Sequence, residues 1–130
     1  MKNCAIILAS GTGSRMGLDV PKQFYKINGK TLLEYSIEAF EIHKAISSVI
    51  IVSNPNFIDL TKEISFKYSK VRTIVKGGLT RQQSSYNGIN SLAGKWIDNV
   101  LIHDAVRPFL SDKIINDCIE ALEKYSAVDV

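Results

Sequence analysis

The chain has 130 residues and a net charge of +3, which is enough length for one domain with a hydrophobic core. Hydrophobic residues make up 45% and charged residues 22%, as in ordinary globular proteins. The basic residues are scattered and no apolar run is long enough to span a membrane, so we expect neither a nucleic-acid nor a membrane partner. Cys4 and Cys118 fit small core residues of a cytoplasmic protein, and the N-terminus leads into a strand without room for a signal peptide.

Strand-like and helix-like segments alternate along the chain. The predicted strands are short runs rich in Val, Ile and Leu, at residues 5–9, 48–52, 71–76 and 99–103. Near-continuous apolar runs of this kind are typical of a parallel sheet that is covered on both faces. A further strand is expected to begin within residues 125–130, and since the chain stops there we expect it to be a fragment of a longer protein.

Helices are predicted between and after these strands. The first begins with a capping box formed by Thr31 and Glu34. The apolar residues expected on the helix faces are Leu33, Ile37 and Phe40 in the first; Tyr86, Ile89 and Ala93 in the third, after a Thr80–Gln83 capping box; and Ile115, Cys118, Ile119 and Leu122 in the fourth, capped by Ser111. The second helix is expected at residues 57–68, and Asn28–Gly29 predicts a tight turn. The order predicts the α/β class: a Rossmann-like three-layer sandwich with a mostly parallel sheet, as one domain over residues 1–130.

The segment after the first strand, residues 8–17, is rich in glycine and carries Arg15. Glycine lets the backbone approach a ligand closely, and successive amides in such a loop form an anion-binding concavity. Lys22 adds a second positive charge nearby. The segment predicts a triphosphate-binding loop, with an ordinary tight turn as the alternative.

Two better-known glycine-rich motifs are absent. The dinucleotide fingerprint needs a third glycine at Met16, and no acidic residue directly follows the second strand. The nearest match to a Walker loop is one residue too long and has Trp96 in place of the metal-binding hydroxyl. A plain dinucleotide-binding domain and a P-loop nucleotidase are therefore disfavoured.

Loops after the other strands should meet the first loop, because ligands bind at the carboxyl ends of parallel strands. Residues 53–55 contain nothing that points to a ligand. The next loop contains Gly77, Gly78 and Ser84, and the last contains His103 and Asp104. Three of the four loops thus bring glycine or charge to one edge of the sheet, which favours a ligand site there.

A nucleoside triphosphate would give each of these groups a task. Amides from Ser10 to Gly13 would hold phosphates, Arg15 would clamp them and Lys22 would supply a compact charge. The Asp104 carboxylate suits Mg²⁺ beside phosphates. The two glycines would let a base lie flat against the backbone, and the serine of the same loop would add a hydroxyl.

Plainer interpretations stay open for the same residues. Arg15 and Lys22 could also be solvated surface charges, as most Lys and Arg side chains are. Asp104 could cap its own turn with Arg107 as ion-pair partner, which is the interpretation we favour for Arg107. His103 fits a core histidine better than a catalytic base, and His43 fits a surface residue at a helix end.

Four segments together resemble the cytidylyltransferase family that makes CDP-methylerythritol in isoprenoid synthesis, and its relatives that make CDP-ribitol. These are residues 8–17, Pro21 to Phe24, residues 77–84 with the pattern G-G-x-x-R-Q-x-S, and residues 103–109 with the sequence HDAVRPF. The resemblance implies a nucleotide-diphospho-sugar transferase fold, with CTP and a polyol phosphate as substrates and Mg²⁺ as cofactor. It also implies that the polyol-phosphate oxygen attacks the α-phosphate and that pyrophosphate leaves.

The resemblance also implies roles for single residues. Arg15 and Lys22 match the catalytic residues that stabilise the transition state, and Asp104 matches the metal ligand. The candidate nucleotide-binding residues are Leu8, Ala9, Ser10, Gly11, Thr12, Gly13, Gly77, Gly78, Ser84, Asp104 and Ala105.

Members of this family continue beyond the length of this chain, with an arm that pairs two subunits. They also carry a second metal-binding aspartate and a further lysine. We therefore expect a homodimer in the full-length form and an acceptor site that needs more residues. The pattern from Gly78 to Gln82 favours 2-C-methylerythritol 4-phosphate as acceptor. Ribitol 5-phosphate is the alternative, and a nucleotide-binding module without chemistry is the second one.

Overall fold

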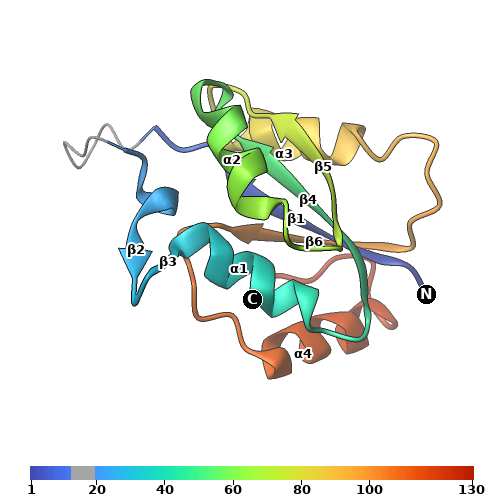
Figure 1. Ribbon diagram of the computed structural model, residues 1–130. Helices are drawn as coiled ribbons and strands as arrows, with labels where there is room; N and C mark the ends of the chain where they lie inside the picture. Colours follow the sequence, from blue (N-terminus) through green and yellow to red (C-terminus); the bar gives the residue numbers. More distant parts are fainter. Residues whose placement is uncertain (13–19) are drawn as a thin grey trace.

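The four apolar runs pair into one parallel sheet in the order β5-β4-β1-β6 (Figure 1). The computed structural model describes residues 1–12 and 20–130. The strands are β1 (Asn3–Ala9), β4 (Ile46–Ser53), β5 (Val71–Lys76) and β6 (Asn99–Asp104). All four predicted strands are confirmed, and the α/β class with them. Three of them are slightly longer than predicted, because pairing continues past the apolar residues.

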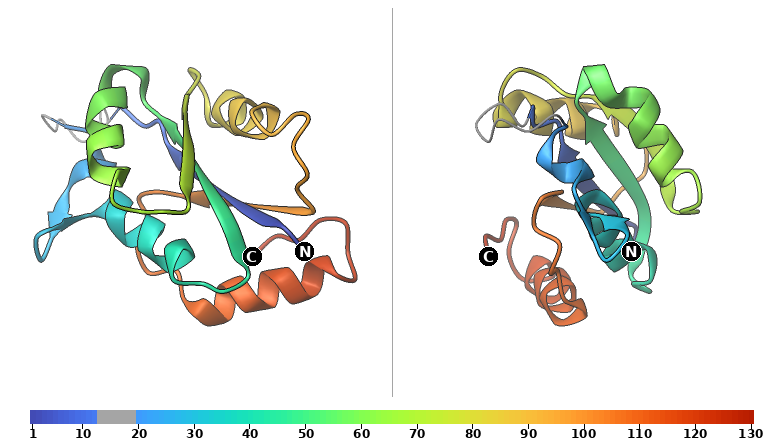
Figure 2. Two further views of the ribbon diagram at one scale, coloured as in Figure 1. Left: turned by 45° about the vertical axis from the view of Figure 1, so that its right-hand side comes forward. Right: turned by 60° about the vertical axis from the view of Figure 1, so that its left-hand side comes forward.

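Helices cover both faces of the sheet, as the three-layer prediction requires (Figure 2). The helices are α1 (Leu32–Glu41), α2 (Ile58–Ser65), α3 (Arg81–Asn90) and α4 (Asp112–Leu122). Alternate residues of β1 belong to separate buried clusters: Ala5 and Ile7 pack with side chains of α1, α2 and α4, whereas Ile6 packs on the opposite side. There Gly88 of α3 lies against it.

The helix caps follow the local sequence closely. Thr31 and Glu34 form the complete predicted capping box at the start of α1. Ser111 caps α4 through the N–H of Ile114. At α3, Thr80 accepts a bond from the N–H of Gln83. The Gln83 side chain bonds within the helix instead, so only half of that capping box forms.

Short elements connect the larger ones. They are the 3-10 turns η2 (Lys22–Phe24) and η3 (Pro55–Phe57) and the strands β2 (Lys26–Ile27) and β3 (Lys30–Thr31). Asn28 and Gly29 have φ angles of 52° and 81°, as the predicted tight turn between β2 and β3 requires. The predicted helix at 57–68 is shorter than expected, because its start is η3 and it ends at Ser65.

Three expectations about packing were wrong. His43 is 5% exposed, since α4 packs over the end of α1 and Asn116 lies 2.8 Å from its Nε2. Helix α3 turns Tyr86 and Ile89 outward, at 61% and 48% exposure, and buries its small residues instead. Residues 125–130 form no strand, because their backbone pairs with no strand among the described residues.

Within residues 1–12 and 20–130, no helix is both long and apolar enough to cross a bilayer. Cys4 is buried and Cys118 partly buried, and both are free thiols. Burial raises the pKa of each thiol, as expected for packing residues.

Candidate nucleotide-binding site

A pocket of about 600 Å³ lies at the carboxyl ends of β1, β5 and β6, where the predicted loops meet. Five segments of the chain line it. From the first loop come Leu8, Ser10, Gly11 and Thr12, from η2 comes Gln23, and from η3 and its N-cap come Asn54, Pro55 and Asn56; from the ends of β5 and β6 and the residues after them come Gly77, Gly78, Leu79, Thr80, Arg81, Asp104 and Val106. Residues as far apart in the chain as Leu8 and Val106 thus line one cavity.

Most of the candidate nucleotide-binding residues that the structure describes line this pocket. They are Leu8, Ser10, Gly11, Thr12, Gly77, Gly78 and Asp104. Ala9, Ser84 and Ala105 lie just beneath, at 2%, 0% and 0% exposure. Gly13 and Arg15 lie outside the described residues.

A buried hydroxyl pair joins two walls of the pocket. Ser84 Oγ lies 2.8 Å from Ser10 Oγ and accepts a hydrogen bond of 3.1 Å from the N–H of Gly78. A Cβ on Gly77 would overlap the Cβ of Ser10, so this glycine is required by the close packing of the two loops. The buried serine of α3 therefore fixes the loop after β5 against the loop after β1.

Ala105 supports the pocket through its backbone. Its N–H donates to the carbonyl of Leu8 at 2.9 Å, and its carbonyl accepts from Ser36 Oγ at 3.1 Å. Both groups are thus bonded within the protein. The residue holds the end of β6 against β1 and α1.

Lys22 is exposed at the start of η2, outside the residues that line the pocket. The next two residues are buried, and the ring of Phe24 lies 5.4 Å from that of Phe57. The position of Lys22 is therefore set by the turn η2, which is held by the buried side chains of Gln23 and Phe24. Its side chain is left in solvent beside the first loop.

Asp104 and Arg81 carry the only charged side chains among the described residues of the pocket. Arg81 Nε lies 3.3 Å from Asp104 Oδ1, and Arg107 Nε lies 3.8 Å from Oδ2. The contact with Arg107 agrees with the interpretation favoured for that residue.

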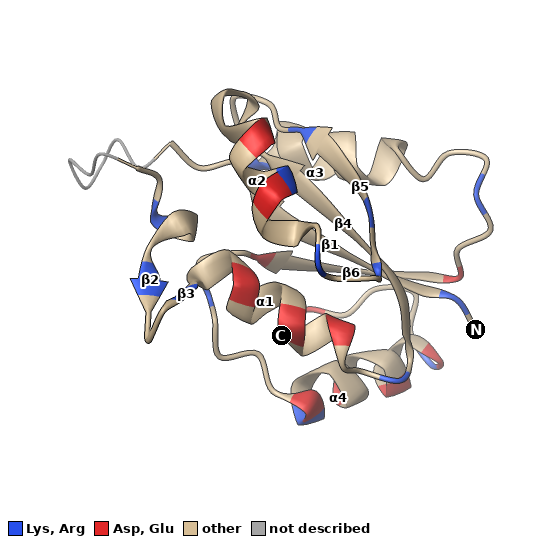
Figure 3. Cartoon of the chain, viewed as in Figure 1, with Lys and Arg blue, Asp and Glu red and all other residues tan. Residues whose placement is uncertain are grey.

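Carboxylates lie along α1, α2 and α4, whereas α3 has none (Figure 3). This edge of the sheet thus has little negative charge to repel an anion.

Asp104 fits Mg²⁺ as a single protein ligand. The described part of the chain brings no three His, Cys, Asp or Glu side chains together as a closed metal site. Mg²⁺ beside phosphates typically takes one or two carboxylates and otherwise phosphate and water oxygens. The donor type and its place in the pocket match that pattern, and metal binding would draw one carboxylate oxygen away from an arginine.

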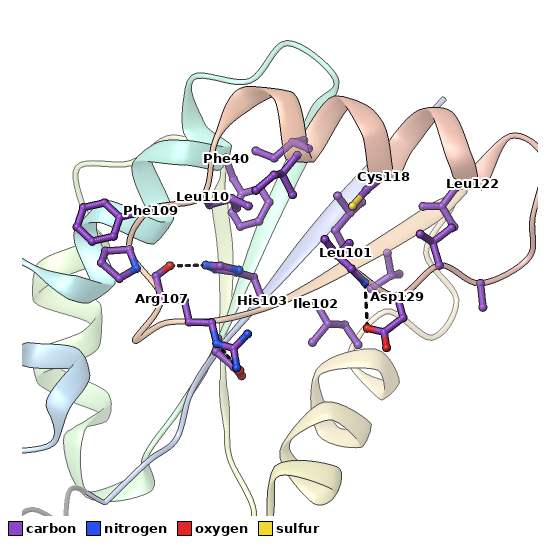
Figure 4. Close-up of a pocket in the computed structure, with 18 of the residues that line it drawn as sticks. Phe40, Leu101, Ile102, His103, Arg107, Phe109, Leu110, Cys118, Leu122 and Asp129 are labelled. Atoms are coloured by element: carbon purple, nitrogen blue, oxygen red, sulfur yellow. Dashed lines mark hydrogen bonds and ion pairs between the residues drawn. The ribbon is translucent and has the colours of Figure 1, made fainter.

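A second groove of about 810 Å³ runs between β6, α4 and the C-terminal residues, and shares Arg81 and Asp104 with the pocket (Figure 4). Its lining is mostly apolar, which does not suit a polyol phosphate. His103 lies on this side, where its Nε2 donates to the carbonyl of Arg107 at 2.8 Å and its ring meets the edge of Phe40. Burial lowers the pKa of His103 below its ordinary value. The expected hydrogen bond is present, but His103 is only partly buried and lies at the wall of the groove rather than in the core.

Gln23, Asn54 and Arg81 belong to the site but were not among the sequence candidates. Gln23 and Arg81 stand inside the motifs that carried the resemblance, which was the signal available for them. Asn54 follows β4 in the loop that offered no such signal. Its part depends on bonds to the first loop, 43 positions away.

A family model described as "IspD: 2-C-methyl-D-erythritol 4-phosphate cytidylyltransferase" matches residues 3–130. The chain belongs to this family. The resemblance inferred from the sequence is thereby confirmed. Since the match begins at the third residue and reaches the last one, the pocket is formed entirely by the family region.

Relatives extend this result. The chain is 48% identical over 132 residues to the bifunctional ribulose 5-phosphate reductase/CDP-ribitol pyrophosphorylase of Haemophilus influenzae, covering 99% of the chain and 28% of that protein. It is 46% identical over 126 residues to the 2-C-methyl-D-erythritol 4-phosphate cytidylyltransferase of Clostridium acetobutylicum, covering 95% of the chain and 54% of that relative.

A solved structure shares the fold. The crystal structure of 4-diphosphocytidyl-2C-methyl-D-erythritol synthase from Anaerococcus prevotii superimposes with a TM-score of 0.79 at 33% identity, covering 94% of this chain and 51% of that one. The predicted nucleotidyltransferase type of fold is confirmed. The chain spans about half the length of these cytidylyltransferases.

Proposed function

We propose that the chain forms the CTP-binding part of a cytidylyltransferase that acts on 2-C-methyl-D-erythritol 4-phosphate. The observation that carries this proposal is the pocket itself, which family motifs from the ends of β1, β5 and β6 line together. A cleft of this kind at the carboxyl ends of parallel strands is where α/β proteins bind nucleotides.

The proposed reaction joins two phosphates. An oxygen of the acceptor phosphate attacks the α-phosphorus of CTP and forms a new P–O bond. The bond from that phosphorus to the oxygen bridging the α- and β-phosphates breaks, and pyrophosphate leaves with the electron pair. Positioning and charge stabilisation are the main tasks of the protein in such a transfer.

The chain's own residues would divide these tasks. Amides of residues 10–13 orient the triphosphate, Gly77 and Gly78 receive the base, and Ser84 and Ala105 hold these loops from below. Lys22 and Arg15 stabilise the charge that develops on the phosphates. Asp104 would hold Mg²⁺, which when bound neutralises phosphate charge.

Binding of CTP tests the first half of the proposal. Calorimetry of the chain with CTP should give heat of binding that depends on Mg²⁺ and is weaker or absent with UTP and GTP. Lys22→Ala should weaken CTP binding, because a point charge beside the phosphates is lost. Lys26→Ala removes another exposed lysine four positions away and should have little effect. Equal binding of all pyrimidine and purine nucleotides would remove the cytidylyl assignment.

Turnover of the full-length form tests the second half. Pyrophosphate release should require CTP together with 2-C-methylerythritol 4-phosphate, and Lys22→Ala should reduce it by orders of magnitude. The relative from Haemophilus influenzae favours ribitol 5-phosphate as the second candidate acceptor. Parallel assays with both acceptors decide between them. Binding of CTP without turnover on either would favour the nucleotide-binding module without chemistry.

The remaining expectations concern the protein's surroundings. A cytoplasmic location, a homodimer of the full-length form and the absence of nucleic-acid and membrane partners stay predictions. Sedimentation of the full-length form with and without CTP checks the oligomeric state. Fractionation of cells checks the location.

A further inference from the structure

Two buried amide side chains hold the first loop by its carbonyl groups. Gln23 Nε2 donates to the carbonyl oxygens of Ala9 and Gly11 at 2.9 and 3.0 Å. Asn54 Nδ2 donates to the same Gly11 oxygen at 3.1 Å. The backbone N–H of Asn54 donates to the carbonyl oxygen of Ala9, also at 3.1 Å. The two side chains are 2% and 4% exposed. Each of the two carbonyls is thus bound twice.

These bonds fix the direction of the neighbouring amides. In a planar trans peptide the C=O of one residue and the N–H of the next point in opposite directions. Since the carbonyls of Ala9 and Gly11 point at Gln23 and Asn54, the N–H groups of Ser10 and Thr12 point away from them. Both residues line the pocket. Amides directed to one side in this way form an anion-binding concavity.

A carbonyl oxygen directed into the pocket in place of these N–H groups would weaken anion binding, because it repels a phosphate oxygen. The glycine at position 11 has few steric barriers to a peptide flip that would bring a carbonyl there. The doubly bound oxygen of Gly11 opposes that flip. Gln23 and Asn54 each donate one bond to that oxygen, and Gln23 alone also reaches the carbonyl of Ala9 with its side chain.

The same glutamine also connects the loop to the proposed catalytic lysine. Gln23 lies in η2 directly after Lys22. Its two bonds to the first loop therefore set the distance between the turn that carries Lys22 and the phosphate-binding amides. One side chain fixes both parts of the charge-binding surface relative to each other.

We propose that Gln23, supported by Asn54, is the positioning residue that presets the first loop for phosphate. It does so by turning the carbonyls of Ala9 and Gly11 away from the anion. The identity of the phosphate compound as CTP rests on the proposed function. The orientation of the loop concerns any polyphosphate, so inorganic tripolyphosphate serves as a second probe.

The experiment measures the affinity of the chain for CTP and for tripolyphosphate, each with Mg²⁺, by calorimetry. Gln23→Met keeps the length and the burial but removes both donors, and should weaken both ligands by about tenfold or more. Gln23→Glu places an anion against two carbonyls and should weaken them further. Asn54→Asp still accepts from the N–H of Asn56, a bond of 2.9 Å, but loses the donor to Gly11, and should have a smaller effect of the same kind.

Asn3 supplies the matched control. It is also 2% exposed, and its Nδ2 donates to the carbonyl of Ala45 at 2.9 Å, at the amino end of β1 far from the pocket. Asn3→Asp should lower the melting temperature as the Gln23 variants do, yet leave both affinities unchanged. Circular dichroism at the temperature of calorimetry confirms that every variant is folded. If Gln23→Met does not fold, Asn54→Asp carries the comparison.

The outcomes separate the two proposals. Variants of Gln23 and Asn54 that bind tripolyphosphate as tightly as the unaltered chain overturn the positioning role, as does an equal loss in Asn3→Asp. An unaltered chain that binds tripolyphosphate but shows no preference for CTP overturns the cytidylyl assignment alone. An unaltered chain that binds neither compound overturns both.

Discussion

Helices α1 and α3 have ten residues each and lie on opposite faces of the same sheet, but they are held there by different means. Helix α1 buries Leu32, Leu33, Ser36, Ile37 and Phe40. Helix α3 buries only Ser84 and Gly88. The first helix therefore presents a broad apolar face, whereas the second approaches closely through small residues.

Because of this difference, α1 contributes mainly to the stability of the core, whereas α3 contributes mainly to the geometry of the site. Burying a Leu, Ile or Phe side chain contributes about 1.5–3 kcal/mol, so the face of α1 supplies a large share of the core energy. Helix α3 supplies little of it. Its buried hydroxyl instead joins Ser10 to Gly78 across the pocket, and its first residue is Arg81. The helix with the weaker core contacts is the one that carries site residues.

The largest effect should come from the core side of this comparison. Phe40 is 1% exposed and lies between α1 and β6. Phe40→Ala should lower the free energy of unfolding by about 3–5 kcal/mol, measured by urea denaturation. Tyr86→Ala on α3, at 61% exposure, should change it by less than about 0.5 kcal/mol. A comparable loss for both would mean that the outer face of α3 is covered in solution.

Close approach of α3 is the next feature to test. A Cβ on Gly88 would lie 2.9 Å from Ile6 Cγ2 and 3.0 Å from Val52 Cγ2. Gly88→Val should therefore destabilise the chain by about 1–3 kcal/mol through overpacking and should weaken CTP binding by shifting α3. Asn90→Val inserts the same side chain at an exposed position of the helix and should do neither. A neutral Gly88→Val would show that α3 has room to move.

The helix caps should give a smaller difference. Thr31 accepts from the N–H of Glu34, whose carboxylate in turn accepts from the N–H and hydroxyl of Thr31. The hydroxyl of Thr80 accepts from the N–H of Gln83, and no side chain of the described residues returns a bond to the N–H of Thr80 in the way Glu34 does at Thr31. Thr31→Ala should cost about 1–2 kcal/mol and Thr80→Ala about 0.5–1 kcal/mol, as measured by thermal unfolding. The reverse order would contradict the assignment of a complete capping box to α1 alone.

Local patterns predicted the fold well, because their causes are local. The apolar runs of β1, β4, β5 and β6 and the caps Thr31 and Ser111 depend on residues next to them. The loops of the site were predicted because parallel strands end at one edge. What could not be predicted depends on distant partners: Gln23 bonds to residues 14 and 12 positions away, and His43 to one 73 positions away. The inner face of α3 was missed since small residues, which leave no apolar pattern, make its contact.

Acid should weaken α1 more than α3, since of these two helices α1 alone contains carboxylates. Burial alone raises the pKa of Glu38, but hydrogen bonds from Lys30 and Tyr68 outweigh it and hold that pKa below the usual 4.5. Burial also raises the pKa of Glu34, but hydrogen bonds from Thr31 and Lys67 outweigh that effect and lower the pKa below its usual value. The folded state therefore binds these protons less readily than the unfolded chain. Their stabilisation is present above about pH 4.5 and is lost as the pH falls through the lowered pKa values.

Tyrosine variants isolate this small effect. The hydroxyl of Tyr68 donates to Glu38 at 2.7 Å, so Tyr68→Phe should move the pKa of Glu38 upward and flatten the loss of stability between about pH 5 and 3. The hydroxyl of Tyr35, in the same helix, donates to the carbonyl of Ile27 at 2.7 Å instead. Tyr35→Phe should keep the slope of the unaltered chain, because no carboxylate loses a bond. Equal slopes for all three proteins in urea titrations at each pH would show that the Tyr68–Glu38 bond does not contribute to the acid sensitivity. The contrast between α1, which contains carboxylates, and α3, which contains none, would then have to rest on Glu34.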